Sequence, residues 1–472
     1  MGLSYEEAAE WPLFYESPGQ QSMMRFAVPQ AEGSRRGGRV LGNRSSTRRS
    51  LKVLWRCQSE VRLTNYRWRV LLWALLLPLG CWAAPLPERT LVLVSIDGFR
   101  WDYLDRPEAR QMKALADKGV RVTKLRPVYP SKTFPGHLSI ATGLRPTGHG
   151  IVDNHFCRND RPDCYSMGAA REDASWLSGT PLWILVEQQG GRAATFFWPE
   201  SEAEVAGTLP SDYRKYDGRI PHAQRVSQVI EWLDTPKADR PHLITLYFSA
   251  VDSAGHTYGP DAPQTLAAIA EVDRWIGALW QAIEEINARD AADINLLLVS
   301  DHGMAVVNPS QFIDTNTLPR PRGFKRVNGS TRVMYYLRDP AADIAALSQR
   351  LEGMSEGRYR VLSREELANR YYLNHPAVAS VIIETEPPRV FRRGGPAGSD
   401  LLGMHGYPAS IEDMAAFLVA IGPAFTTATV IPEAHQLDIF PVATRMLKLD
   451  SPASVVSDGG ALRDALKAAE RE

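Results

Sequence analysis

The sequence predicts an α/β protein in which helices cover both faces of a central, mainly parallel β-sheet. From residue 89 onward, short apolar runs alternate with amphipathic stretches. Strands that alternate with helices along a chain are typical of βαβ units, whose crossover helices bury both faces of a parallel sheet. The 472 residues, 44% of them hydrophobic, suffice for one large domain or two medium-sized ones.

The elements follow from apolar periodicity along the chain. The run Leu91–Ile96 is expected to be the first buried strand, and a helix is expected over Glu108–Lys118. Further strands are expected at Arg121–Val128, Ala193–Phe197, Leu243–Phe248, Ile294–Val299 and Ala415–Ile421. Further helices are expected at Gly136–Thr142, Pro181–Gln189, Pro221–Leu233, Pro263–Ile286 and His435–Leu447.

A less regular stretch interrupts this alternation. Strands are expected at Val333–Leu337 and Ser380–Glu384 around a helix over Ala341–Leu351, and Gly394–Asp400 is a loop rich in Gly and Pro. We therefore expect one domain over residues 84–472, with a small subdomain inserted near residues 310–400.

The N-terminal segment differs from the rest of the chain in charge. Residues 1–84 contain 12 Lys and Arg but 6 Asp and Glu, which leaves 42 basic and 48 acidic residues in the remainder. A mildly acidic body argues against a protein that binds polymeric nucleic acid. Residues 1–66 are rich in Arg, Ser and Gly, and we interpret them as a disordered extension or as the result of a start site assigned too early.

Residues 67–83 have the pattern of a signal peptide. Arg67 and Arg69 form a basic start, an apolar run follows over Val70–Leu79, and Ala83 is a small residue suited to cleavage. The apolar run is short for a membrane-spanning helix, so no stable span is expected in the mature form. A buried core helix and a retained anchor are the alternatives. Export predicts a periplasmic or secreted protein.

Two cysteines lie beyond the predicted cleavage site. Cys157 and Cys164 enclose a polar loop of six residues, whereas Cys57 and Cys81 belong to the segment that we expect to be lost. In an oxidising compartment this spacing favours a small loop-closing disulfide. A zinc knuckle would need a second cysteine pair, which the sequence lacks.

Carboxylates and imidazoles follow the predicted strands at the points where these end. In open α/β sheets ligands bind at the carboxyl ends of the strands, so we expect these side chains to share one crevice. Carboxylate and imidazole without thiolate suit catalytic zinc, and six such groups suit two ions roughly 3.5–4 Å apart. Each residue alone also fits a turn, a helix cap or a surface pair. The six are Asp97, Asp252, His256, Asp301, His302 and His405.

Thr133 is the predicted nucleophile. It lies between Pro130 and Pro135, just before the predicted start of a helix. A hydroxyl there meets free backbone N–H groups and the positive end of the helix dipole. A metal ion can lower the pKa of such a hydroxyl without the help of a histidine base. A helix-capping threonine is the purely structural alternative.

Several motifs together resemble one family. They are Ser-Ile-Asp-Gly-Phe-Arg at 95–100, Pro-Ser-Lys-Thr-Phe-Pro-Gly-His at 130–137, Thr-Gly-Leu-Arg-Pro-Thr-Gly-His-Gly-Ile-Val-Asp-Asn at 142–154, Asp-Ser-Ala-Gly-His at 252–256, Ser-Asp-His-Gly-Met at 300–304 and His-Gly-Tyr at 405–407. In this order, over roughly 89–447, they are similar to the nucleotide pyrophosphatase/phosphodiesterases of the alkaline phosphatase superfamily. The chain resembles a bacterial-type exported member.

The resemblance implies an alkaline phosphatase-like fold and two Zn²⁺ ions. One zinc would take Asp252, His256 and His405, and the other Asp97, Asp301 and His302, with Thr133 bridging toward the second. Asn154 and a backbone N–H near the nucleophile would hold a non-bridging phosphate oxygen. Phe134 would stack on a nucleobase, and Tyr216, whose local sequence match is looser, would be its partner on the other side.

The implied reaction is hydrolysis of a small phosphodiester or nucleotide in two steps, through a phosphothreonine intermediate, with release of nucleoside 5′-monophosphates. A sulfatase would need a Cys or Ser nucleophile, and a phosphomonoesterase would favour a cation where Asn154 lies. A choline-type lipid diesterase and a non-catalytic binding module of the same fold remain alternatives.

Overall fold

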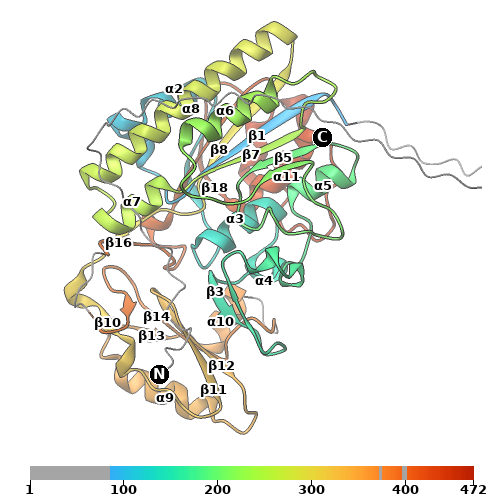
Figure 1. Ribbon diagram of the computed structural model, residues 1–472. Coiled ribbons are helices and arrows are strands. Elements are labelled where there is room, and N and C mark those ends of the chain that lie inside the picture. Colours follow the sequence, from blue (N-terminus) through green and yellow to red (C-terminus); the bar gives the residue numbers. More distant parts are fainter. Residues whose placement is uncertain (1–85, 372–374, 396–400, 472) are drawn as a thin grey trace, which may run out of the picture. The chain divides into compact units, whose positions relative to one another are not determined.

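The computed structural model describes residues 86–371, 375–395 and 401–471 (Figure 1). The predicted signal peptide at 67–83, the extension at 1–66 and two cysteines, Cys57 and Cys81, lie outside the described residues. Within the described ranges, no helix combines the length and the apolar character that a membrane span requires.

The main sheet has eight strands in the order β18-β2-β17-β8-β1-β7-β5-β6. Every neighbouring pair is parallel except those made by β17, which runs antiparallel to both β2 and β8. The strands are β1 (Arg89–Ile96), β2 (Val120–Arg126), β5 (Ala193–Phe196), β6 (Asp212–Arg214), β7 (Leu243–Phe248), β8 (Asp293–Val299), β17 (Ala416–Ile421) and β18 (Thr429–His435).

Helices cover both faces of this sheet, as the continuous apolar strands require. Along β1, Leu91 and Leu93 enter one core with α3 (Thr133–Thr142), α5 (Leu182–Gln188) and α11 (Ile439–Leu447). Val92 and Val94 enter a second core on the opposite face. Its helices are α2 (Arg110–Lys118), α6 (His222–Leu233) and α8 (Pro263–Asp290), which Figure 1 shows along one side of the sheet.

A second, antiparallel sheet has the strand order β11-β12-β14-β13. We call it the small sheet; its strands are β11 (Phe324–Asn328), β12 (Arg332–Leu337), β13 (Arg360–Val361) and β14 (Val381–Glu384). Val333 and Tyr335 of β12 pack with α9 (Ile344–Ser355), whereas Met334 and Tyr336 enter an apolar cluster that also holds Phe134. The alternating side chains of β12 therefore contact α9 on one face and the cluster around Phe134, the residue after the predicted nucleophile, on the other.

The remaining elements are short. The hairpin of β3 (His155–Cys157) and β4 (Cys164–Ser166) is closed by the predicted Cys157–Cys164 disulfide. Two further pairs are β9 (Ala305–Val306) with β16 (Gly403–Met404), and β10 (Ile313–Asp314) with β15 (Phe391–Arg392). Three more helices are α4 (Pro146–His149), α7 (Ala250–Tyr258) and α10 (Arg364–Tyr371).

The bounds of several helices differ from the prediction. α3 begins at Thr133 rather than at Gly136, because Pro135 falls in the first turn, where a missing N–H costs nothing. The last helix becomes α-helical only at Ile439, after a 3₁₀ turn at Gln436–Asp438. No helix was predicted directly after β7, where Asp252 and His256 both belong to α7.

Candidate active site

The register of three neighbouring strands brings four of the predicted metal ligands to one edge of the sheet. In β1, Ile96 pairs with Phe248 of β7, and Ser95 pairs with Val299 of β8. Asp97 follows β1 directly, while Asp301 and His302 follow β8 after one residue. Asp252 lies in the first turn of α7, which begins two residues after β7. The parallel sheet thus places these side chains together at its carboxyl edge.

The other two predicted ligands come from α7 and from the segment after β16. His256 is four residues after Asp252, so both face the same side of α7. Its Nε2 lies 3.4 Å from Oδ1 of Asp252, and Nε2 of His405 lies 3.6 Å from the same oxygen. The six residues form one group, which we call the strand-end cluster: Asp97, Asp252, His256, Asp301, His302 and His405.

His302 lies at the centre of this cluster. Its Nε2 is 2.9 Å from Oδ2 of Asp301 and 3.5 Å from Oδ1 of Asp97, and its ring stacks on that of His405 with 3.5 Å between centroids. Among the described residues, two groups have ligand atoms close enough to share an ion. They are Asp252 with His302 and His405, and Asp97 with His137 and Asp301. His302 can therefore share an ion with Asp252 and His405, whereas its contacts with Asp301 and Asp97 agree with the pairing that the resemblance implies.

All three cluster histidines are oriented by backbone carbonyls. Nδ1 of His256 lies 2.8 Å from the backbone oxygen of Gly403. Nδ1 of His302 lies 2.9 Å from that of Gly303, and Nδ1 of His405 lies 3.0 Å from that of Ser131. A carbonyl only accepts, so Nδ1 carries the proton and the lone pair of Nε2 points into the cluster. Fixing the tautomer through the other ring nitrogen is typical of metal-ligating histidines.

The carboxylates of the cluster also suit cations. Oδ1 of Asp97, Oδ1 of Asp252 and Oδ2 of Asp301 are buried and accept no hydrogen bond of good geometry. Buried carboxylate oxygens without donors are costly unless a cation compensates them. Together with the three Nε2 atoms, they form a donor set that fits two zinc ions.

The pKa shifts of the three carboxylates reflect their burial and the repulsion between them. Burial, followed by repulsion from Asp301 and Asp252, raises the pKa of Asp97 well above its usual range. Burial raises the pKa of Asp252 to about 7. For Asp301 burial acts in the same direction, but the neighbouring His302 and His137 outweigh it and hold its pKa well below the usual range. Bound cations would relieve this repulsion.

Thr133 lies at the border of the strand-end cluster. It is the first residue of α3, and its Oγ1 is 3.5 Å from Nε2 of His302. The helix approaches the cluster closely at Gly136, where an added Cβ would lie 3.1 Å from Cβ of Asp301. The hydroxyl therefore faces the imidazole of His302 from the positive end of a helix.

Asn154 is fixed against the start of the same helix. Its Oδ1 accepts a hydrogen bond from the backbone N–H of Phe134 at 3.0 Å. With Oδ1 used as an acceptor, the two protons of Nδ2 remain for other partners. The N–H of Phe134 is thus engaged by Asn154 rather than open toward the site.

Phe134 and Tyr216 lie in different parts of the core. Phe134 packs edge-on against Tyr165 with 6.4 Å between centroids, and Tyr165 stacks on Phe156 at 4.9 Å. We call Phe134, Phe156, Tyr165 and Trp176 the aromatic cluster. Tyr216 instead packs against Phe197 at 5.0 Å, and its hydroxyl lies 3.4 Å from Oγ of Ser249.

Two residues of the site were not predicted. His137 is buried, with Nδ1 2.8 Å from the backbone oxygen of Thr133 and Nε2 2.7 Å from Oγ of Ser95. Tyr247 of β7 donates to Oδ2 of Asp97 at 2.5 Å. His137 could have been found from its spacing of four residues after Thr133, which places the two on one side of a helix. Tyr247 could have been found as the hydroxyl-bearing residue in the otherwise apolar end of β7.

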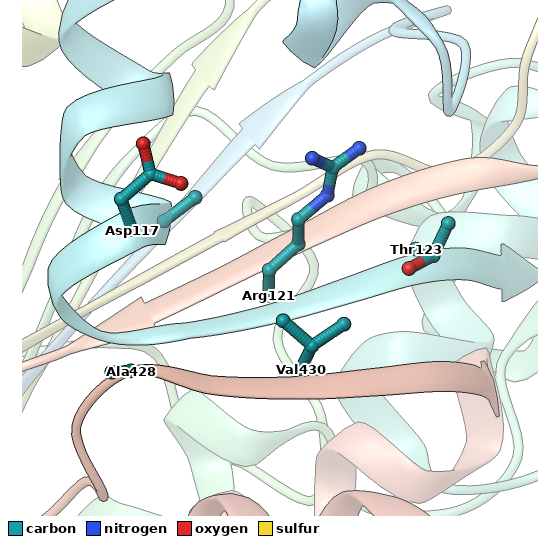
Figure 2. A pocket seen from close by; sticks show the side chains of 6 residues that line it. Asp117, Arg121, Thr123, Ala428 and Val430 are labelled. Carbon is teal, nitrogen blue, oxygen red and sulfur yellow. The ribbon is translucent and has the colours of Figure 1, made fainter.

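A cavity of about 310 Å³ lies elsewhere, between the end of α2 and the strands β2 and β18 (Figure 2). Figure 2 shows Arg121 rising between Asp117 and Thr123 above Val430. The guanidinium of Arg121 already pairs with Asp105 at 2.6 Å. This cavity contains none of the predicted site residues.

Fold and cluster together define a class: an α/β protein of alkaline phosphatase-like fold with carboxylates and imidazoles at the carboxyl edge of its sheet. The sequence model of the family described as "Type I phosphodiesterase / nucleotide pyrophosphatase" matches residues 91–408. The chain belongs to this family.

Individual relatives agree. The chain is 31% identical to the venom phosphodiesterase CdcPDE of Crotalus durissus collilineatus over 399 residues, which cover 80% of this chain and 47% of that protein. It is 38% identical to human ectonucleotide pyrophosphatase/phosphodiesterase family member 1 over 231 residues, which cover 48% of this chain and 24% of the human protein. The matched part thus spans less than half the length of either relative.

A solved structure shows the same fold. Murine ectonucleotide pyrophosphatase/phosphodiesterase 5 is 25% identical and superposes with a TM-score of 0.73, covering 80% of this chain and 100% of that chain. The murine protein has also been solved as an inactive variant in complex with AMP.

Proposed function

We propose that this protein is a two-zinc hydrolase of phosphodiester and pyrophosphate bonds in nucleotides, and that it releases nucleoside 5′-monophosphates. The observation that carries the proposal is the position of the Thr133 hydroxyl, 3.5 Å from Nε2 of His302 at the border of the strand-end cluster. A nucleophile at a helix N-terminus beside a two-cation donor set is an arrangement suited to phosphoryl transfer.

The proposed metal assignment is the one that the family resemblance implies. Asp252, His256 and His405 would hold one zinc, and Asp97, Asp301 and His302 the other, with Thr133 Oγ1 at the second. The central position of His302 also allows it to face the first ion. When bound, the two ions would neutralise charge on the entering and leaving oxygens and lower the pKa of the threonine hydroxyl.

The residues of the chain would then perform two displacements. Oγ1 of Thr133 gives up its proton and forms a bond to phosphorus, the bond to the leaving oxygen breaks, and a phosphothreonine that carries the nucleoside results. Water then attacks the same phosphorus and the bond between phosphorus and Oγ1 breaks, so that the nucleoside monophosphate leaves and Oγ1 takes up a proton released by the water. Nδ2 of Asn154 would hold a non-bridging oxygen throughout, since its Oδ1 is already fixed by Phe134 N–H.

The proposed substrate class rests on two aromatic side chains and on the relatives. Phe134 and Tyr216 would receive the nucleobase, each backed by further rings. The relatives are named for nucleotide pyrophosphatase and phosphodiesterase activity, and the murine structure holds AMP. A neutral amide at Asn154 suits the single charge of a diester.

The deciding experiment compares substrates on one preparation. A p-nitrophenyl ester of a nucleoside 5′-monophosphate should be cleaved much faster than p-nitrophenyl phosphate, and the phosphate-bearing product should be the nucleoside monophosphate. Faster cleavage of glycerophosphocholine or lysophosphatidylcholine would establish the lipid-headgroup alternative. Zinc binding without turnover of any diester would establish a non-catalytic module.

We also propose that the protein is exported. The pattern at 67–83 and the Cys157–Cys164 disulfide support this, because disulfides persist in oxidising compartments. N-terminal sequencing of the mature protein should give a start near Ala84. Recovery of active protein with residues 1–66 intact would contradict cleavage.

A further inference from the structure

A buried ion cluster outside the strand-end cluster joins three segments of the chain. Asp153 precedes Asn154, Lys132 precedes Thr133, and Arg332 begins β12 of the small sheet. Their exposed fractions are 2%, 8% and 1%. Charged groups are seldom buried so completely unless they are paired, so the arrangement calls for a reason.

Arg332 fixes the loop that carries Asn154. Its Nε donates to Oδ2 of Asp153 at 2.6 Å, and one terminal nitrogen donates to the backbone oxygen of Val152 at 2.6 Å. One guanidinium thus holds both a side chain and a carbonyl of the two residues before Asn154. Lysine could not reproduce this, because its ammonium lacks the planar fork of donors.

Asp153 transmits this constraint to Asn154. Its Oδ1 accepts the backbone N–H of Asn154 at 2.7 Å and lies 3.3 Å from Nζ of Lys132. Burial opposes ionisation, but Arg332 and Lys132 together hold the pKa of Asp153 below its usual range. The carboxylate is therefore charged and can accept from all three donors.

The last contact in this series joins Asn154 to α3, the helix that begins at Thr133. Asn154 accepts the N–H of Phe134, the residue after Thr133. The stem of Lys132 runs past Gly406, where an added Cβ would lie 2.6 Å from Cε of Lys132, so the same lysine also packs beside the residue that follows His405. The contacts form a continuous path from the small sheet through Asp153 and Asn154 to the start of α3.

We propose that Asp153 is a positioning residue for the phosphate-binding amide of Asn154, and that Arg332 of the small sheet holds Asp153 in place. The inference rests on the proposed function, because the orientation of Asn154 matters only if a phosphodiester occupies the site. It gives the small sheet a catalytic consequence: the sheet contributes no reacting group, yet it fixes the direction of one.

The test is a double-mutant cycle on the zinc-loaded protein, with a p-nitrophenyl nucleotide ester as substrate. Asn154→Ala, Arg332→Lys and Asp153→Asn are made singly, and the first is combined with each of the others. We expect Arg332→Lys to lower kcat about tenfold and Asp153→Asn more, with the zinc content unchanged. Each double variant should be no slower than Asn154→Ala alone, because its positioning residue then has nothing left to position.

Further variants separate positioning from general damage. Asp273→Asn is the matched control, since Asp273 is also buried and accepts the backbone N–H groups of Gln111 and Met112, which belong to α2 rather than to the site. It should lower the melting temperature without lowering kcat. If Asp153→Asn does not fold, Lys132→Met, which leaves the Asp153–Arg332 pair intact, is taken through the same cycle and should lose less than Arg332→Lys.

Additive losses in the double variants would overturn the inference, as would wild-type kcat in Arg332→Lys. The proposed function fails differently: the wild-type protein would then cleave no diester, or Asn154→Ala would turn over at the wild-type rate. The two failures are therefore distinguishable within one set of measurements.

Discussion

The two sides of the site are held in place by different kinds of structure. The strand-end cluster is fixed by backbone register, because β1, β7 and β8 are neighbours and end level with one another. Asn154 is fixed by the contact between Arg332 and Asp153, which are distant in sequence, and the aromatic cluster by packing around the disulfide-closed hairpin. Substitutions in the strand-end cluster should therefore abolish most of the activity, whereas substitutions around the aromatic cluster and Asn154 should lower it by smaller amounts.

The largest effect is expected at Thr133, where the two sides meet. Thr133→Ala removes the only atom proposed to bond to phosphorus, so kcat should fall at least about a thousandfold, while Thr133→Ser keeps part of the activity. Steady-state kinetics together with zinc analysis measure this. Thr142→Ala, on the same helix with its hydroxyl bonded to the oxygen of Leu138, should leave kcat close to wild type. A wild-type rate in Thr133→Ala would end the proposed mechanism.

The next effect tests the strand-end cluster as a metal site. Purified protein should hold about two zinc ions per chain, and Asp252→Ala should lower that content and reduce activity at least about a hundredfold. Elemental analysis of the two proteins decides the matter. Asp261→Ala, in the segment after α7 where Asp261 pairs with Arg100 and Arg106, should retain both ions. Full activity in metal-free protein would exclude the assignment.

A smaller, substrate-selective effect should characterise the aromatic side. Stacking of a base on an aromatic ring contributes roughly 1–3 kcal/mol, so Phe134→Ala should weaken binding of a nucleotide ester about ten- to a hundredfold. Bis-p-nitrophenyl phosphate, which has no base, should be affected far less. Ratios of kcat/KM for the two substrates are the measurement. Equal losses on both would remove the base-stacking role and favour a lipid-headgroup diester.

The smallest effect concerns stability beside the aromatic cluster. Glu200 is buried and accepts the Tyr165 hydroxyl; burial raises its pKa from 4.5 to about 7. Between these values the folded state binds the proton more tightly than the unfolded state, so stability falls as pH rises through this window. Glu200→Gln should therefore have a higher melting temperature than wild type at pH 8.5, with a gain in the free energy of unfolding on the order of 3 kcal/mol at most. At pH 4.5 the two proteins should differ little.

Melting curves of both proteins across pH 4.5–8.5 measure this difference. Glu284→Gln, an exposed residue of α8, serves as the control and should show no pH-dependent change relative to wild type. A constant gap between Glu200→Gln and wild type at all pH values would show that Glu200 is ionised to the same extent in the folded and unfolded states.

Much of the main sheet and of the strand-end cluster could be predicted because both depend on local pattern. Apolar runs such as Leu91–Ile96 and Ile294–Val299 can be buried only as inner strands, and polar residues directly after them must lie at the sheet's carboxyl edge. The start of α3 was placed three residues late, because Pro135 suggests a boundary unless it is known to occupy the first turn.

The contacts that orient the site could not be predicted in this way. His137 reaches Ser95, Tyr247 reaches Asp97, and Arg332 reaches Asp153 across 179 positions of sequence. No periodicity encodes such pairs, because each depends on how separate elements pack rather than on the backbone of either one. By itself, the sequence determined which side chains are the candidates for the chemistry and which edge of the sheet they share. Only the tertiary structure decided how they are aimed, since burial of charges requires partners that folding alone brings into reach.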